Sequence, residues 1–539
     1  MSQSAFIEEV PDEQHESSGG ELEDATVEDV LAPGSSAGKK KKKKKSKAAK
    51  ALSAFQMKAS VSQPLVDEVL KRVQAEVGPS HPEANEQSVR EALQQLKVND
   101  YLEGKSGLGG KNKKDMGDYK FWSTQPVSKL GEAPPQEDGY IDPALPRNEV
   151  RQEPYPLPKD FEWVAVDMTN QAELTELYEL LSANYVEDDG ATFRFKYSAE
   201  FLQWALMPPG WHKEWHVGVR VKSNRKLVAF IGGAPVTLRV RNAQFKSVEI
   251  NFLVVHKKLR GKRLAPVLIK EVTRQCNLKG IFQAIYTAGV FLPTPVSICR
   301  YYHRLLNIPK LVEVGFTGMK PGMTVARMVR LFKLPSAPAL ATRGLREMEE
   351  RDIPEVRALY NQYMKRFGMI AVYSAEDLKH LFLSGLGRGQ VKQGRREGQV
   401  IWSYVVEDPN TQKISDFFSF YTLPSTILGN ARYNVLDAAY LWNYGTTVAL
   451  QNGADEDGRL KRRLNELVSD ALVIAELAKF DVFNAMTLMD NDMFLSDLKF
   501  GQGDGLLNFY LYNWRTSSLS GVDAVGEYPK GRGIGIVML

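Results

Sequence analysis

Residues 249–269 read EINFLVVHKKLRGKRLAPVLI, and this stretch decides the fold. Residues 248–255 form a mostly apolar run that predicts a buried strand. Residues 265–275 predict a helix, because Pro266 suits the first helical turn and apolar residues follow it at helical spacing. A short basic turn joins the two. The stretch therefore predicts a strand, a turn and a helix in succession.

The turn is densely cationic and directly precedes the predicted helix. The free backbone N–H groups at a helix start, together with the helix dipole, favour an anion there. Clustered cations at such a point suit a pyrophosphate or nucleotide phosphate, although an exposed basic loop has the same composition. The position between strand and helix favours the phosphate site. The cations are Lys257, Lys258, Arg260, Lys262 and Arg263.

From Tyr119 onward the chain mixes short strands with helices, which predicts an α/β fold of the α+β kind. A proline-containing seam at residues 334–338 divides this part into two halves of similar size. Residues 227–231 predict a strand that ends in a turn at Gly232 and Gly233. The elements predicted in the second half are strands at 414–421 and 509–514, a helix at 467–479, and polar loops at 385–398, 429–433 and 451–463.

The composition excludes several classes of protein. Of the 539 residues, 43% are hydrophobic, which is ordinary for a globular protein with a large core. Two cysteines, Cys276 and Cys299, form no disulfide framework and fit a reducing compartment. No run of about 18 apolar residues predicts a membrane span, and the N-terminus lacks the apolar core of a secretion signal. These features predict a cytoplasmic protein.

Residues 1–118 predict a disordered tail and linker, apart from a weakly helical pattern at 65–96. Residues 8–29 are acidic and contain no Lys or Arg, whereas an unbroken lysine run extends from Lys39 to Lys45. Such blocks of like charge repel themselves and stay solvated. The run is compatible with a solvated tail or a nuclear address. It is equally compatible with docking on ribosomal RNA or on an anionic membrane face.

Several long motifs, in colinear order over residues 119–539, resemble those of the eukaryotic N-myristoyltransferases. Residues 249–269 are similar to the first signature of that family, and residues 499–505 (KFGQGDG) are similar to its second. The likeness to the wider GNAT superfamily of acyl-CoA transferases is looser, because Arg263 stands where its phosphate loop has glycine. The other similar stretches are FWSTQPVSKLGE (121–132), RQEPYPLP (151–158), NYVEDD (184–189), FYTLPSTI (420–427) and SDALVIA (469–475).

The resemblance implies two GNAT-like halves with pseudo-twofold symmetry around a mixed, curved β-sheet. Residues 119–335 would bind myristoyl-CoA, and residues 336–539 would bind the peptide and supply a catalytic C-terminus. The implied enzyme is a glycylpeptide N-tetradecanoyltransferase, an acyltransferase that moves myristate from myristoyl-CoA to the N-terminal glycine amine of protein substrates. Acyl-CoA would bind first and the amine would attack directly. The resemblance further implies a monomer, with no metal and no permanently bound cofactor.

The resemblance also implies which residues form the reacting centre. Backbone N–H groups of Phe252 and Leu253 would stabilise the thioester oxyanion, which requires a local break in strand pairing. Without the resemblance, both are plain strand residues. Asn251 and Thr287 would position the glycine amine. The implied acyl-CoA contacts are Tyr119, Lys120, Phe121, Trp122, Phe252, Leu253, Val254, Val255, Arg260, Gly261, Lys262, Arg263, Leu264 and Ala265.

By the same resemblance, the last residue, Leu539, supplies its terminal carboxylate as the base. An N-terminal amine has a pKa of about 7.7 to 8.0 and must lose a proton before it attacks. Residues 531–539 support this role independently, because their apolar, glycine-spaced sequence favours burial, and burial raises the basicity of a carboxylate. Simple packing of a C-terminal strand accounts for the same pattern.

The implied peptide contacts are Tyr185, Glu187, Asp188, Asp189, Tyr197, Tyr301, His303, Ser419, Tyr440 and Asp504. The acidic run among them would attract basic residues of the substrate, or it is a solvated loop. Asp504 lies in a glycine-rich segment that predicts a loop.

Rival constellations predict other chemistry. Cys299 and His303 are spaced to face each other on a helix, as a thiol acyl carrier requires, although a core cysteine is the simpler interpretation. His212 and His216 have metal-like spacing but lack a third ligand. Two other functions compete with the first: another acyl-CoA transferase, such as an N-acetyltransferase, and a ribosome-binding adaptor with a catalytically inactive body.

Overall fold

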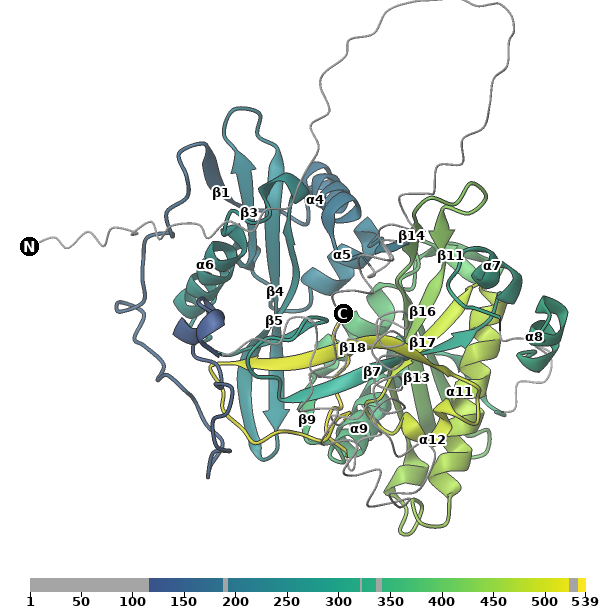
Figure 1. The fold of residues 1–539 in the computed structure, drawn as a ribbon. Coiled ribbons are helices and arrows are strands. Elements are labelled where there is room, and N and C mark those ends of the chain that lie inside the picture. Colours follow the sequence, from purple (N-terminus) through teal and green to yellow (C-terminus); the bar gives the residue numbers. More distant parts are fainter. Residues whose placement is uncertain (1–115, 188–191, 320–321, 336–341, 523–531) are drawn as a thin grey trace, which may run out of the picture. The chain divides into compact units, whose positions relative to one another are not determined.

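The computed structural model describes residues 116–187, 192–319, 322–335, 342–522 and 532–539 (Figure 1). The acidic segment, the lysine run and the weakly helical pattern at 65–96 lie outside these residues. So do Asp188, Asp189 and most of the seam at 334–338. What the sequence predicts for them stays a prediction.

A 13-stranded mixed sheet runs through the described residues. Its strands are β1 (Phe161–Ala165), β3 (His216–Val221), β4 (Leu227–Val240), β5 (Ala243–Val255), β6 (Ala284–Ala288), β7 (Ser297–Leu305), β8 (Leu345–Glu347), β9 (Met369–Ala371), β12 (Ile401–Glu407), β13 (Ile414–Thr422), β16 (Ala438–Thr446), β17 (Val482–Met486) and β18 (Gly501–Tyr512). Their order is β1-β3-β4-β5-β6-β18-β7-β17-β16-β13-β12-β8, with β9 paired to β4. Two parallel pairs, β5 with β6 and β16 with β17, lie among antiparallel ones.

The strand order is symmetric about its centre. In each half a strand is joined through a helix to a parallel neighbour: β5, α6 (Leu264–Leu278) and β6 in the first, β16, α11 (Arg459–Leu477) and β17 in the second. The strand that follows in each half then pairs with the other half. β7, which follows β6, pairs with β17, and β18, which follows β17, pairs with β6. β7 and β18 also pair with each other, and Figure 1 shows them running through the middle of the fold. The predicted pseudo-twofold arrangement around a mixed sheet is confirmed.

Helices bury their apolar faces against this sheet. The longer ones, besides α6 and α11, are α4 (Gln171–Asn184), α5 (Ala199–Leu206) and α9 (Ile353–Met364). Leu268, Val272 and Cys276 of α6 share one buried cluster with residues of β3, β4 and β5. Asn170 caps α4, since its side chain accepts hydrogen bonds from two backbone N–H groups of the first turn. The apolar spacing that predicts these helices therefore also orients them on the sheet.

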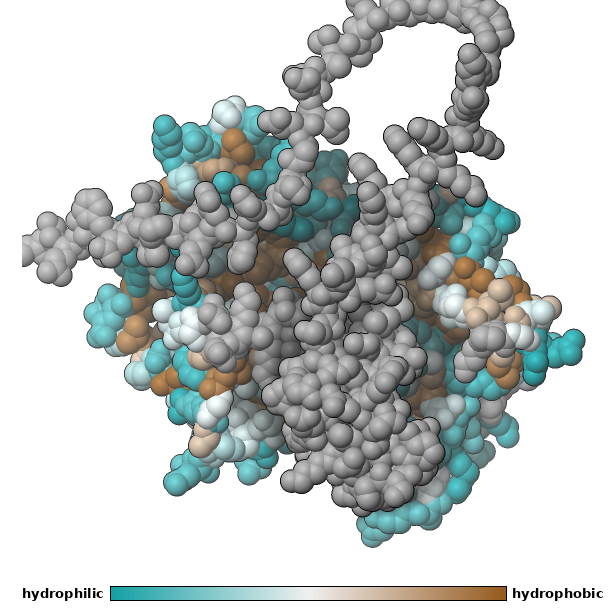
Figure 2. Space-filling model, in the orientation of Figure 1, coloured by the Kyte–Doolittle hydropathy of each residue, from teal (hydrophilic) through white to brown (hydrophobic). Residues whose placement is uncertain are grey.

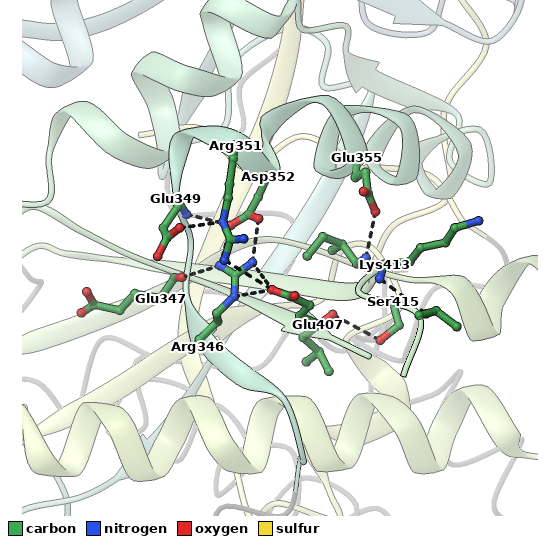
Figure 3. Close-up of polar contacts among 12 residues, drawn as sticks. Arg346, Glu347, Glu349, Arg351, Asp352, Glu355, Glu407, Lys413 and Ser415 are labelled. Atoms are coloured by element: carbon green, nitrogen blue, oxygen red, sulfur yellow. Dashed lines mark hydrogen bonds and ion pairs between the residues drawn. The ribbon is translucent and has the colours of Figure 1, made fainter. Parts of the chain in front are cut away.

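A cluster of charges ties the start of α9 to the edge of the sheet (Figure 3). Arg346 of β8 donates two hydrogen bonds of 2.7 Å to the carboxylate of Asp352 and one of 2.7 Å to Glu407 of β12. Glu349 and Asp352 cap the short helical turn that leads into α9. Because two-pronged pairing of a guanidinium with a carboxylate fixes geometry, edge strand β8 and the start of α9 are held together.

Several predictions about local structure are wrong. Gly232 and Gly233 lie inside β4 and form no turn; a Cβ at Gly232 would come within 2.7 Å of the Leu206 side chain, so close packing explains this glycine. Residues 459–463, expected in a polar loop, form the start of α11. Residues 385–398 contain the hairpin of β10 (Arg388–Lys392) and β11 (Arg395–Glu397).

Apolar side chains are exposed beside two short helices, α7 (Ile308–Glu313) and α8 (Val325–Leu331). These side chains are Met319, Val329 and Leu331, and Figure 2 shows apolar residues at the surface over these helices. In the part of the chain that the structure describes, no helix combines the length and the apolar character needed to cross a bilayer.

Candidate active site

The hairpin of β4 and β5 contains a β-bulge at Phe252 and Leu253. Its register shifts between Phe230 and Gly232, so that Ile231 alone lies opposite both bulge residues. Phe252 has a φ of 59°, a left-handed conformation that bulky residues rarely adopt. The break in strand pairing that an oxyanion site requires is therefore present at these two residues.

The bulge lies where β5 separates from β6. The parallel ladder joins residues 248–250 of β5 to residues 284–286 of β6, whereas β5 continues to Val255 and β6 to Ala288. If the register continued by one residue, Asn251 would lie opposite Thr287. The two residues expected to position the amine thus occupy matching places on two diverging strands, beside the bulge.

The C-terminal segment, residues 532–539, runs through the interior. Ile534 forms a parallel bridge with Met369 of β9. The N–H of Leu539 lies 3.5 Å from Oε1 of Glu249 on β5, and Figure 1 shows the C-terminus inside the fold. The segment's buried apolar side chains are Ile534, Ile536, Val537 and Met538. The predicted burial is confirmed, and it brings the terminal carboxylate next to the strand that carries the bulge.

Ion pairs fix the start of this segment. Nε of Arg532 donates a hydrogen bond of 2.6 Å to Asp490, and its Nη2 donates one of 2.9 Å to Asp455. Arg366 pairs with the same Asp455 at 2.9 Å, and the hydroxyl of Tyr363 donates to Asp490 at 2.7 Å. Because Asp490 is buried and satisfied from two sides, the chain enters the site from a fixed point.

Replacing Gly533 by alanine is expected to lower the free energy of unfolding by about 1–3 kcal/mol or more. A Cβ at Gly533 would lie 1.9 Å from the carbonyl oxygen of Ser520, so one of the two main chains must shift. Urea unfolding followed by tryptophan fluorescence measures the change. Gly139→Ala is the matched control, since nothing lies within 4 Å of a Cβ there. Equal unfolding midpoints for the two variants would contradict the close packing of the C-terminal segment.

An aromatic stack connects the predicted acyl-CoA segment, residues 119–122, to the sheet. Trp122 stacks on Tyr286 of β6 with ring centroids 5.5 Å apart, and Tyr286 stacks on Tyr510 of β18 at 5.0 Å. The hydroxyl of Tyr119 donates a hydrogen bond of 3.4 Å to the main chain of the loop after β6. The structure therefore brings this segment beside the strand that ends next to the bulge.

The basic turn between β5 and α6 is exposed at the start of a long helix. Gly261 and Arg263 adopt left-handed conformations, with φ of 78° and 56°, and so close the turn directly before α6. The side chains of Lys258, Lys262 and Arg263 are exposed. Cations beside the N–H groups of a helix start form an anion site, and the turn has this arrangement.

The two other cations of the turn contact the protein itself. Lys257 pairs with Glu187 at 2.6 Å, and Arg194 donates to the same carboxylate at 2.6 Å. Lys257 first, and then Arg194, hold the pKa of Glu187 below its usual range. Arg260 donates to the carbonyl of Asn184 at 2.5 Å. Glu187 therefore links the chain after α4 to the basic turn, and its charge is compensated within the protein.

Tyrosines from both halves gather near the bulge. The ring of Phe252 lies 5.1 Å from that of Tyr197 and 6.4 Å from that of Tyr185. Tyr421 and Tyr440 stack at 5.4 Å. Burial raises the pKa of Tyr185 to about 12, against a smaller opposing effect of a backbone hydrogen bond at Phe252. Such hydroxyls stay protonated at neutral pH and can orient a peptide by hydrogen bonding.

The remaining predicted groove residues differ in accessibility. Tyr301 and His303 lie on β7, and Nδ1 of His303 is 2.7 Å from Oδ1 of Asn484. Asp504 is exposed on β18, in a strand instead of the predicted loop. Ser419 is fully buried, and its hydroxyl donates to a carbonyl of β16 at 2.9 Å. A contact between Ser419 and a peptide stays a prediction, because this hydroxyl already has a partner inside the sheet.

The structure does not support the rival constellations. Cys299 and His303 lie on β7, where four residues span about 13 Å, so they do not meet as they would on a helix. Burial raises the pKa of the Cys299 thiol, which makes it a poor nucleophile. His216 is buried, with Nε2 3.1 Å from the carbonyl oxygen of Leu206. Among the described residues, no group of three His, Cys, Asp or Glu side chains could hold a metal ion.

Two residues near the reacting centre, Glu249 and Tyr421, were not predicted. Glu249 precedes Asn251 by two residues in a mostly apolar strand, so the two side chains lie on one face. An acidic residue on the face of Asn251 was the sequence feature that could have identified Glu249. Tyr421 lies in the FYTLPSTI motif, but its stacking on Tyr440 follows from the pairing of β13 with β16, which no local pattern specifies.

These features together suit acyl transfer. A bulge with backbone N–H groups, a terminal carboxylate beside β5 and an exposed cationic helix start are groups that can stabilise an oxyanion, accept a proton and bind a phosphate respectively.

Comparison with known proteins supports this chemistry. The sequence model described as Myristoyl-CoA:protein N-myristoyltransferase, N-terminal domain, matches residues 140–299, and the corresponding C-terminal domain matches residues 313–537. A glycylpeptide N-tetradecanoyltransferase of Aspergillus fumigatus is 51% identical over 452 residues, which cover 83% of this chain and 89% of that protein. The protein of that name from Schizosaccharomyces pombe is 48% identical over 460 residues, or 84% of this chain and 96% of the relative.

A solved structure agrees with the sequence matches. The crystal structure of Saccharomyces cerevisiae N-myristoyltransferase with bound myristoyl-CoA has a TM-score of 0.72 and 47% identity, and the match covers 79% of this chain and 100% of that one. The chain therefore belongs to the myristoyl-CoA:protein N-myristoyltransferase family, and it is an acyltransferase.

Proposed function

We propose that this acyltransferase moves myristate from myristoyl-CoA to the N-terminal glycine amine of protein substrates by direct addition and elimination. Its relatives are named glycylpeptide N-tetradecanoyltransferases, and the yeast enzyme was solved with myristoyl-CoA bound. The observation that carries the proposal is the bulge at Phe252 and Leu253 on the strand that the end of the chain contacts. Donors for an oxyanion and a carboxylate for a proton thereby meet beside one strand.

The proposed reaction begins with a proton transfer. The substrate ammonium, with a pKa of about 7.7 to 8.0, gives a proton to the carboxylate of Leu539. The neutral amine, oriented by Asn251 and Thr287, attacks the thioester carbon, so a C–N bond forms and the carbonyl oxygen becomes anionic. Backbone N–H groups of Phe252 and Leu253 stabilise that oxygen. The C–S bond then breaks, and CoA leaves as a thiolate that takes up the second amine proton.

The two halves divide the binding of the substrates in this proposal. Residues 119–335 hold the acyl-CoA, with its phosphates on the basic turn and residues 119–122 beside β6. Residues 336–539 supply much of the peptide groove and the C-terminus. We infer that acyl-CoA binds first, since the tyrosines of the groove pack over Phe252, where the acyl group must arrive. Titration calorimetry would contradict this order if the peptide bound equally well with and without acyl-CoA.

Replacing Lys262 by alanine is expected to weaken myristoyl-CoA binding by about 5- to 50-fold at low salt, by removing a charged contact to phosphate at an exposed site. The loss should shrink as salt rises, because exposed charges are screened. Titration calorimetry at two salt concentrations measures both effects. Lys222→Ala, at an exposed lysine of the loop between β3 and β4, is the matched control. A loss independent of salt would argue against a phosphate contact.

The experiment that tests the proposed function is CoA release from myristoyl-CoA with a peptide that begins with glycine. A peptide that begins with alanine, and acetyl-CoA, serve as controls. Because each buried CH₂ contributes about 0.8 kcal/mol, lauroyl-CoA should bind about fifteenfold more weakly through area alone. Equal rates with lauroyl-, myristoyl- and palmitoyl-CoA would overturn the myristoyl assignment, and turnover of acetyl-CoA would favour an N-acetyltransferase.

A further inference from the structure

Glu249 lies between the side chain of Asn251 and the last residue of the chain. Nδ2 of Asn251 donates a hydrogen bond of 2.7 Å to Oε1 of Glu249. The N–H of Leu539 points to the same oxygen at 3.5 Å. Glu249 and Asn251 are two residues apart on β5 and project from one face of the strand. One carboxylate oxygen therefore contacts both residues that are proposed to act on the amine, through the side-chain amide of Asn251 and the backbone N–H of Leu539.

Apart from the terminal carboxylate of Leu539, the groups that face this carboxylate are largely uncharged. Its register partners are Ala234 on β4 and Ile285 on β6, and the phenols of Tyr373 and Tyr421 are its titratable neighbours from the other half. Burial raises the pKa of Glu249, against the hydrogen bonds from Asn251 and Leu539. No cation of the described residues is among the groups that shift it. Burying a charged carboxylate without a cation beside it lowers the stability of the folded protein.

The hydrogen bond to Glu249 also orients the amide of Asn251. An amide has two donors on nitrogen and one acceptor oxygen. With the nitrogen held by Glu249, the oxygen of Asn251 is turned away from the carboxylate and can accept from a substrate ammonium. Without Glu249 the amide could rotate and present a donor instead, which would repel the ammonium.

We propose that Glu249 is a positioning residue, whose single carboxylate oxygen holds the amide of Asn251 and the main chain of Leu539 in register around the substrate amine. The inference rests on the proposed function, because it requires Asn251 and Leu539 to act on that amine. Glu249 itself takes no proton from the substrate; the terminal carboxylate does. The role needs a hydrogen-bond acceptor at this position and does not need its charge.

Two substitutions separate acceptor from charge. Glu249→Gln keeps an oxygen that can accept from both donors, whereas Glu249→Ala removes it. The alanine variant should lose about 10- to 100-fold in kcat, since a displacement of about 1 Å at a reacting centre can cost 10²-fold. Its KM for myristoyl-CoA should stay unchanged. The glutamine variant should keep kcat within about threefold. An active alanine variant, or a glutamine variant as slow as the alanine one, would overturn the proposal.

A second measurement needs no catalysis. Carboxypeptidase releases Leu539 only when the C-terminus opens locally, so release from the substrate-free full chain should be faster for Glu249→Ala than for wild type. Glu249→Gln should behave as wild type does, and urea midpoints measured in parallel exclude global unfolding as the cause. Equal release rates for all three would overturn the positioning role. An inactive wild type would instead overturn the proposed function, while the release rates would still decide the role of Glu249.

Discussion

Deletion of Leu539 is expected to lower kcat for acyl transfer by about 10²- to 10⁴-fold, the usual contribution of a positioned general base. The deletion moves the terminal carboxylate back by one residue, roughly 3.8 Å along the chain, and away from Glu249, whose Oε1 lies 3.5 Å from the N–H of Leu539. The substrate ammonium then keeps its proton in the site. Because a higher pH deprotonates the amine without help, the deficit should shrink as pH rises above about 8.

CoA release with a glycine peptide, measured from pH 6 to 9, tests this expectation. Leu539→Ala is the matched control, since it shortens the side chain and keeps the terminal carboxylate in place; its kcat should stay within about tenfold of wild type. Binding of myristoyl-CoA should survive the deletion, because the basic turn before α6 is untouched. Full activity in the deletion variant would remove the terminal carboxylate from the mechanism and leave the rest of the site intact.

Local sequence patterns correctly predicted the strand and the helix on either side of the basic turn. The strand β5 and the helix α6 follow from a mostly apolar run, a proline in the first turn and helical spacing. The errors have local causes too. Gly232 and Gly233 have the composition of a turn but lie in β4, and Gly232 is glycine because Leu206 leaves no room for a Cβ there. Residues 459–463 resemble a polar loop because the first turns of α11 carry many charges towards solvent.

The site depends on contacts that no local pattern encodes. Leu539 and Glu249 are 290 positions apart, and their contact depends on tertiary packing that brings the C-terminal segment to β5. The apolar, glycine-spaced sequence of residues 531–539 predicted burial but did not indicate which strands the segment would contact. The clamp of Asp490 on Arg532 was equally invisible, since each charge alone has the composition of a solvated surface. The resemblance to a family supplied the expectation that Leu539 lies at the reacting centre, but it supplied neither Glu249 nor the clamp, and residue spacing supplied the strand, the turn and the helix.

An amide-to-ester replacement at Leu253 is expected to lower kcat by about 10²- to 10³-fold, as the loss of one oxyanion donor does in other acyl-transfer enzymes. The ester removes the backbone N–H and keeps the side chain and the shape of the strand. Leu253 is preferred to Phe252, whose backbone also hydrogen-bonds with Tyr185 and whose ring is buried; the side chain of Leu253 is 36% exposed. KM for myristoyl-CoA should change little, because the charge on oxygen develops only in the transition state.

The same ester at Val248 separates chemistry from stability. The N–H of Val248 donates to the carbonyl of Gln283 at 3.0 Å in the ladder before the bulge, so its loss should cost about 0.5–1.5 kcal/mol of stability and leave kcat nearly unchanged. A kcat lowered equally by both esters would mean that strand disruption, not oxyanion stabilisation, slows the reaction. Combining the Leu253 ester with deletion of Leu539 sharpens the test. If donor and base act as a unit, the double variant should lose less than the product of the two single losses; a fully multiplicative loss would mean that the two groups act independently of each other.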